Sequence, residues 1–61
     1  MKNPEYVVGY YTGHDDGYCE DPPKFHPRDK SKPFVAGYIT GYFDGKEFRS
    51  IIESYIKKRN K

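Results

Sequence analysis

Several residue types are scarce or missing from this chain, and each absence excludes a class of protein. Tryptophan is missing, and Cys19 is the single cysteine among the 61 residues. One cysteine cannot form an internal disulfide, so a disulfide-stabilised secreted domain is not predicted. No apolar run approaches the roughly 20 residues that a membrane-spanning helix needs, and none follows the first residues as in a secretory signal. We therefore expect a cytoplasmic protein without a membrane partner.

The short length argues against catalysis. We treat residues 1–61 as one small domain, because a core of this size supplies only a few kcal/mol of net stability. Such a domain has little means of excluding water from reacting groups. His14 and Cys19 could be a base and a nucleophile, but no third residue orients the histidine at a recognisable spacing. The glycines lack the Lys-Ser/Thr of a phosphate-binding loop. We predict a protein that is not an enzyme and uses no cofactor.

A metal site is not predicted either. The possible metal ligands that we consider are His14, Asp15, Asp16, Cys19 and His26, all in the first half of the chain. A structural zinc site normally uses paired ligands such as Cys-x2-Cys with a second pair. The acidic run also lacks the glutamate that closes a calcium-binding loop. These residues are expected to form a solvated helix end.

The most informative feature that is present is an internal repeat. Segment 9–17, GYYTGHDDG, returns twenty-eight residues later as segment 37–45, GYITGYFDG. All six glycines of the protein lie in these two copies at a spacing of four, namely Gly9, Gly13, Gly17, Gly37, Gly41 and Gly45. On a helix this spacing aligns three glycines along one face, which lets a second helix come very close. We predict that the six glycines form the packing surface of two helices.

Prolines indicate where these helices begin. Pro4 suits the first turn of a helix over 5–17, and Pro33 likewise opens a second helix over 34–45. The segment between them, 20–33, contains four prolines, which exclude a helix interior or a central strand. The sequence therefore predicts an all-α domain of two glycine-faced helices that pack as an antiparallel pair across a proline-rich linker.

A C-terminal helix over 46–59 is the clearest single element. Apolar residues at helical spacing predict an amphipathic face that comprises Phe48, Ile51, Ile52, Tyr55 and Ile56. Asp44 and Glu47 resemble a capping box. A new helix could therefore start after Asp44, or the second helix could continue through Gly45, and the sequence leaves both open.

The alternative fold is a small α+β domain. Asp44-Gly45 is a strong hairpin signal, and the residues before it are β-prone. In that arrangement, 34–43 would pair with 46–50. The four-residue glycine period argues against it, because a strand alternates faces every two residues.

The repeated motif and the linker resemble the ribosome modulation factor family of bacteria and phages. Gly9, Tyr10, Gly13 and Gly17 would take positions of the first family helix. Pro22 or Pro23 would lie in the linker, and Gly37, Tyr38 and Gly41 in the second helix. The resemblance implies a two-helix protein that docks on the small ribosomal subunit near the 3′ end of its RNA. There it would occlude the messenger-docking region and promote inactive ribosome dimers.

The distribution of charge agrees with an RNA partner, although the net charge is only +2. Basic residues combined with aromatic rings are typical of RNA-binding surfaces. The candidate RNA-binding or partner-binding residues are Lys24, Arg28, Lys30, Lys32, Tyr38, Tyr42, Lys57, Lys58 and Arg59. We expect a ribosome-associated modulator that binds ribosomal RNA and silences translation, with Tyr38 and Tyr42 supporting the helix pair.

Two other interpretations remain open. Seven tyrosines suit a protein interface, which would indicate a phage or mobile-element inhibitor of a single host protein. The other is a homodimer that assembles through an exposed glycine face.

Overall fold

Two helices joined by a long linker make up the described part of the protein. The structure, a computed structural model, describes residues 3–59 and contains no strand there. Helix α1 spans Pro4–Cys19, the 3-10 helix η1 spans Pro27–Asp29, and helix α2 spans Lys32–Arg59. The all-α prediction is confirmed. The hairpin alternative is wrong, because Asp44 and Gly45 lie within α2.

Local signals explain where the helices begin and end. The Asn3 side chain accepts a hydrogen bond from the backbone N–H of Glu5 over 2.8 Å, and Pro4 follows it at the first helical position. Helix α1 ends at Cys19, and Glu20 caps it with a left-handed φ of 58° and an N–H that donates to the carbonyl groups of Asp16 and Gly17. The Ser31 hydroxyl accepts from the N–H of Phe34 over 3.3 Å at the start of α2. Each helix thus starts after a polar residue that caps it and has a proline in its first turn, where proline is tolerated.

Helix α2 is continuous through Gly45. Of the two arrangements that the sequence left open, one continuous helix is therefore correct, and separate helices over 34–45 and 46–59 are wrong. Gly45 lies in the contact with α1, where a Cβ would overlap the backbone of His14. Asp44 does not cap a new helix, since its carboxylate accepts a hydrogen bond from Tyr10 of α1 over 2.6 Å. Packing against α1 therefore stabilises the helix at the position where local propensity favours a break.

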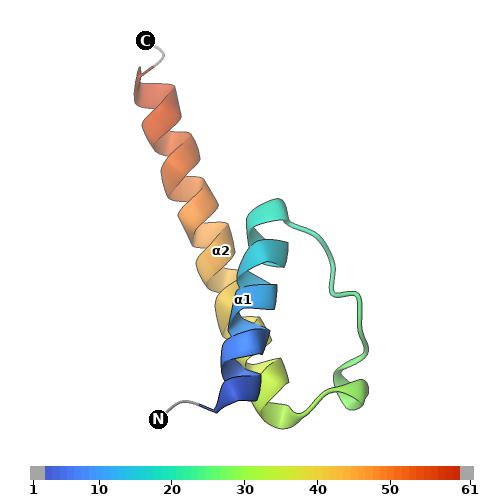
Figure 1. The fold of residues 1–61 in the computed structure, drawn as a ribbon. Coiled ribbons are helices and arrows are strands. Elements are labelled where there is room, and N and C mark those ends of the chain that lie inside the picture. Colours follow the sequence, from blue (N-terminus) through green and yellow to red (C-terminus); the bar gives the residue numbers. More distant parts are fainter. Residues whose placement is uncertain (1–2, 60–61) are drawn as a thin grey trace.

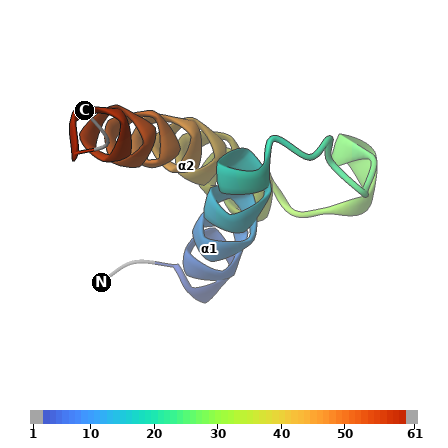
Figure 2. The ribbon, with the colours of Figure 1, turned by 90° about the horizontal axis from the view of Figure 1, so that it is seen from above.

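The helices run parallel, so the predicted antiparallel pair is wrong (Figure 1). Gly9, Gly13 and Gly17 face the backbone carbonyls of Phe34, Tyr38 and Tyr42, so residue numbers rise together along both helices. The linker makes this possible. Helix α1 has 16 residues and is about 24 Å long, whereas residues 20–31 could extend to about 40 Å. The linker can therefore return to the starting end of α1, and it does so along one side of the pair (Figure 2).

All six glycines are buried in the α1–α2 contact. A Cβ on Gly13 would lie 2.8 Å from the carbonyl carbon of Tyr38, and its oxygen would be nearer still. On the other helix, Gly37, Gly41 and Gly45 face the carbonyls of Tyr6, Tyr10 and His14 in the same way. Any side chain at these positions would separate the backbones, which explains why both copies of the repeat carry glycine.

Little apolar surface is buried elsewhere. Tyr38, at 4% exposure, is the one buried hydrophobic side chain within residues 3–59. The C-terminal half of α2 extends beyond the end of α1 (Figure 1), and the molecule measures 46 × 27 × 10 Å. Over the described residues, neither helix combines the length and the apolar character that crossing a membrane requires. The fold is a thin helix pair with a projecting helical arm.

Candidate functional site

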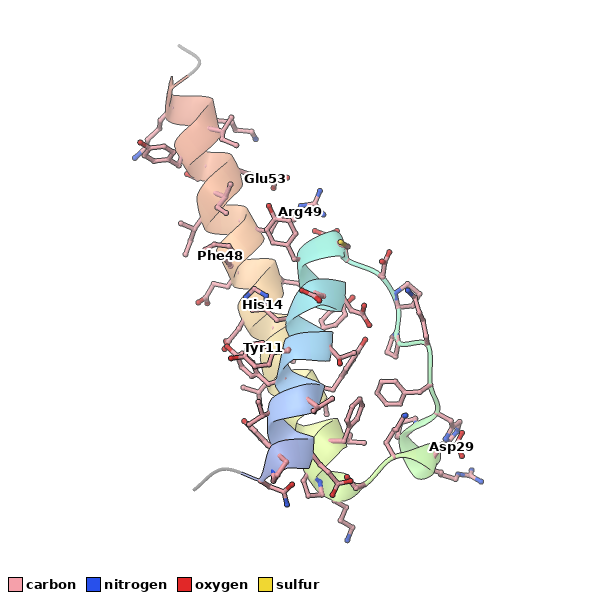
Figure 3. The ribbon with its side chains drawn as sticks, in the orientation of Figure 1. Tyr11, His14, Asp29, Phe48, Arg49 and Glu53 are labelled. Atoms are coloured by element: carbon pink, nitrogen blue, oxygen red, sulfur yellow. The ribbon has the colours of Figure 1, made fainter. Side chains whose placement is uncertain are left out.

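The linker carries the basic cluster, which we define as Lys24, Arg28, Lys30 and Lys32. All four side chains are exposed. Among the described residues none of them forms an ion pair; the ion pair found there joins Arg49 to Glu53 over 3.4 Å. The nearest acidic neighbour in sequence is Asp29 of η1, which lies on the linker on the side away from α2 (Figure 3). Within nine residues of sequence, the cluster therefore offers four exposed positive charges that form no ion pair among the described residues, against the one negative charge of Asp29.

Aromatic contacts hold this linker against α2. The Phe25 ring meets the rings of Phe34 and Tyr38 edge-on, with centroid distances of 5.3 and 4.8 Å. Lys30 places its ammonium group 5.2 Å from the centre of the Phe34 ring. The Tyr42 hydroxyl donates to the carbonyl of Asp21 over 2.9 Å at the start of the linker. Phe25 is thus engaged inside the protein and does not offer a free ring for base stacking.

A turn around η1 arranges the middle of the basic cluster. The ring Nδ1 of His26 accepts a hydrogen bond from the backbone N–H of Arg28 over 3.1 Å. The N–H of Asp29 also donates to the carbonyl of His26 over 2.8 Å. With Pro27 fixing the backbone at the first position, these bonds reduce the conformations that the loop must lose on binding.

The remaining basic candidates lie at the opposite end of the molecule. Lys57 and Lys58 are exposed in the last turn of α2, where positive charge complements the helix dipole. The Arg59 side chain lies outside the part that the structure describes. Because α2 projects away from the linker along the long axis of the molecule (Figure 1), the basic residues form two separate sites.

Tyr38 and Tyr42 make hydrogen bonds that hold the helix pair and the linker together. The Tyr38 hydroxyl donates to the Asp16 carboxylate over 2.6 Å. Burial of the ring and then this hydrogen bond raise the pKa of Tyr38 above its ordinary value. The structure therefore supports the part of the prediction that gave these tyrosines a packing role.

A second tyrosine–aspartate pair joins the helices on the opposite side. Tyr10 donates to Asp44 over 2.6 Å, and this hydrogen bond is the main cause that raises the pKa of Tyr10. Sequence reasoning did not assign Asp16 or Asp44 a role as acceptors. A signal was present, because each aspartate follows its repeat's tyrosine at the same spacing (Tyr10 and Asp16, Tyr38 and Asp44).

Arg49 has a role that the sequence did not indicate. Helix α1 has no basic residue in its last turn. Arg49 of α2 supplies the charge instead, because its Nη1 donates to the carbonyl of Tyr18 over 2.9 Å. Figure 3 shows Arg49 beside the end of α1, one turn of α2 before Glu53. A cation at this end stabilises the carbonyl groups that the helix leaves unpaired.

The predicted amphipathic face of α2 is largely uncovered. Phe48 contacts α1 through the rings of His14 and Tyr18, at centroid distances of 5.9 and 6.1 Å. Beyond it, α1 has ended. Ile51 is 61% exposed and Ile56 is 49% exposed, while Ile52 is half-buried. We name Phe48, Ile51, Ile52 and Ile56 the arm stripe. An exposed apolar face of this kind is typical of an interaction surface.

The potential metal ligands do not gather. Within residues 3–59 no three His, Cys, Asp or Glu side chains are close enough to hold an ion. His14 packs on Tyr10 and Phe48, and Asp16 accepts from Tyr38. Cys19 is exposed. Within the described residues, these side chains thus take part in separate contacts or lie at the surface.

Comparison with known proteins does not assign the chain to a family. No family model, no curated protein and no solved structure matches the chain.

Proposed function

We propose that this protein is a non-catalytic modulator that binds the RNA of the small ribosomal subunit and silences translation. The observation that carries the proposal is the basic cluster on the linker, whose four side chains are exposed and form no ion pair within the described residues. RNA is the partner that this chemistry fits, since lysine and arginine gain affinity by displacing counterions from phosphates. The resemblance to the ribosome modulation factor family suggests the same partner.

The contacts of the linker favour binding to the RNA backbone over reading of bases. Phe25 is engaged with Phe34 and Tyr38, so the cluster offers charge without a free ring beside it. Contacts to phosphate carry no sequence information. We therefore infer that the shape of an RNA segment, and not its base sequence, determines where the linker binds.

The test is binding of the purified full chain to small ribosomal subunits across a salt series. Four phosphate contacts predict a slope of about −3 for the logarithm of affinity against the logarithm of salt. Combined replacement Lys24→Glu, Arg28→Glu, Lys30→Glu and Lys32→Glu should weaken binding by about 100-fold or more at low salt. Helix content, measured by circular dichroism, should not change, because all four side chains are exposed.

A matched pair of single variants controls for overall charge. Lys30→Glu changes the linker, and Lys46→Glu makes the same change on an exposed lysine of α2. The proposal expects a larger loss of binding for Lys30→Glu. Equal losses, or an affinity that does not depend on salt, would contradict it.

A second candidate is a phage or mobile-element inhibitor that binds one host protein directly. The observation that favours it is the arm stripe, where Ile51 is 61% exposed. Capture from bacterial lysate with and without nuclease separates the two candidates. A host protein that is retained after nuclease treatment and lost with Ile51→Ser plus Ile56→Ser supports this candidate. Small subunits that are lost after nuclease treatment support the first.

A further inference from the structure

The internal repeat gives the helix pair an approximate two-fold symmetry. Each glycine contact between α1 and α2 has a counterpart in which both residues are exchanged for their repeat partners, twenty-eight positions away. Gly9 faces the carbonyl of Phe34, and Gly37 faces the carbonyl of Tyr6. The hydrogen bond from Tyr38 to Asp16 corresponds in the same way to the bond from Tyr10 to Asp44. The two sides of the pair therefore present the same arrangement of tyrosine, aspartate and threonine.

One of these two sides is occupied by the linker. Phe25 packs against the stacked rings of Phe34 and Tyr38 and makes a T-shaped contact with each, at 5.3 and 4.8 Å. Tyr38 is only 4% exposed as a result of its place under the linker and against α1. The occupant is an aromatic side chain on a proline-flanked segment, Pro23-Lys24-Phe25-His26-Pro27.

The symmetric side is open. A groove of about 470 Å³ lies there, lined by Tyr6, Val7, Tyr10, Tyr11, Thr40 and Asp44. Their repeat partners are Phe34, Val35, Tyr38, Ile39, Thr12 and Asp16, which include the two rings that Phe25 contacts. We name this space the Tyr6–Tyr10 groove.

The chain takes a different course after each copy of the repeat, and this difference breaks the symmetry. After the first copy, Glu20 ends α1, and Pro22 and Pro23 turn the chain back along the pair. After the second copy no proline occurs, and α2 continues. Glu53, the position twenty-eight residues after Phe25, is therefore an exposed helical residue on the arm. Within the described residues, no segment contacts Tyr6 and Tyr10 in this groove as Phe25 contacts Phe34 and Tyr38 on the other side, where a smaller hollow of about 390 Å³ remains beside the linker.

We propose that the Tyr6–Tyr10 groove binds an aromatic side chain on an extended, proline-flanked segment of a partner protein. Tyr6 and Tyr10 would hold the ring edge-on, as Phe34 and Tyr38 hold Phe25. Aromatic-lined grooves bind proline-containing segments well because such segments lose little conformational entropy. A second copy of this chain does not supply the segment, because its own Phe25 is engaged. The inference depends on the repeat geometry and not on the proposed RNA partner.

The test uses a synthetic peptide with the linker sequence PPKFHPR, capped at both ends, and the full chain labelled for NMR. Addition of the peptide should shift the signals of Tyr6 and Tyr10 saturably, with a dissociation constant of about 1 mM or tighter. The same peptide with alanine in place of phenylalanine is the control and should cause no saturable shift.

Two protein variants related by the repeat locate the site. Tyr11→Asp alters the rim of the open groove, and Ile39→Asp makes the corresponding change beside the linker. Both side chains are more than half exposed, at 67% and 52%, so the fold should tolerate both changes. Tyr11→Asp should weaken peptide binding about tenfold, and Ile39→Asp should leave it unchanged. Absence of a saturable shift, or shifts confined to Phe34 and Tyr38 through displacement of the linker, would overturn the proposal.

Discussion

The Tyr38 hydroxyl donates a hydrogen bond to the Asp16 carboxylate over 2.6 Å and joins α2 to α1. The same bond connects Tyr10 to Asp44 across the repeat, but there both residues are more open to solvent. One sequence motif thus produces two contacts that differ in burial, because the linker covers only one of them.

Removal of the two tyrosine hydroxyls should therefore have unequal effects. Tyr38→Phe leaves a part-buried carboxylate without its donor, so we expect the free energy of unfolding to fall by about 1.5–3 kcal/mol. Tyr10→Phe should cause a much smaller loss, because water replaces the donor at Asp44. Urea denaturation of the two variants measures both effects. Losses of equal size would show that the linker does not shield the Tyr38–Asp16 bond.

Alkaline pH should destabilise the fold through Tyr38. Burial and the hydrogen bond to Asp16 raise its pKa above the ordinary value of 10.0, so the folded protein keeps the proton that the unfolded chain releases. The stabilisation is complete below the unfolded pKa and is lost as the pH rises above about 10 toward the folded pKa. Stability measured between about pH 8 and 11 should fall less steeply in Tyr38→Phe than in the parent chain.

Alanine at the central glycines should destabilise the helix pair. A Cβ at Gly13 or Gly41 would lie 2.8 Å from a carbonyl carbon of the other helix, so the backbones must separate. We expect Gly13→Ala and Gly41→Ala each to lower stability by about 1–3 kcal/mol or more, although alanine raises helix propensity by about 1 kcal/mol. Thermal melting followed by circular dichroism measures the change. Ser54→Ala on the exposed arm is the control and should not destabilise.

Loss of the Phe25 ring should release the linker. Phe25 is half-buried, so Phe25→Ala should cost about 1–2 kcal/mol, less than the roughly 3–5 kcal/mol for a fully buried phenylalanine. Amide exchange and protease cleavage within residues 20–31 should become faster. Ile51→Ala shortens an apolar side chain on the arm, at a site that is 61% exposed, and should leave both rates unchanged. Unchanged linker rates in Phe25→Ala would mean that η1 and Tyr42 hold the segment without the ring.

Local signals in the sequence predicted the helical parts well. Pro4 and Pro33 lie in the first turns of α1 and α2, and the glycine period indicated the face where the helices meet. These features follow from short-range sterics, since proline suits a first turn and glycine permits close approach. The break at Asp44, which the sequence left open, does not occur, because capping propensity is worth about 1 kcal/mol and the contacts with Tyr10 and His14 override it.

The candidate site was predicted in part. Exposure of the linker lysines follows from their charge, as solvation of ions favours the surface. Phe25, Arg49 and the two aspartates each contact a residue of another element. These contacts depend on how the helices and the linker pack together, and the neighbouring residues in the sequence do not determine that packing. The arm stripe was recognised as an apolar face, but the sequence did not indicate that α1 would end before covering it.

The sequence by itself determined which segments form helices, which helix face carries the glycines and the charge of the linker. The tertiary structure alone decided the parallel direction, the continuity of α2 and the difference between the covered groove and the open Tyr6–Tyr10 groove. A glycine period is the same along a helix in either direction, so it specifies how closely two helices approach but not their relative orientation. That choice depends on the linker, which is long enough to return to the start of α1 and is held there by the packing of Phe25 against Phe34 and Tyr38.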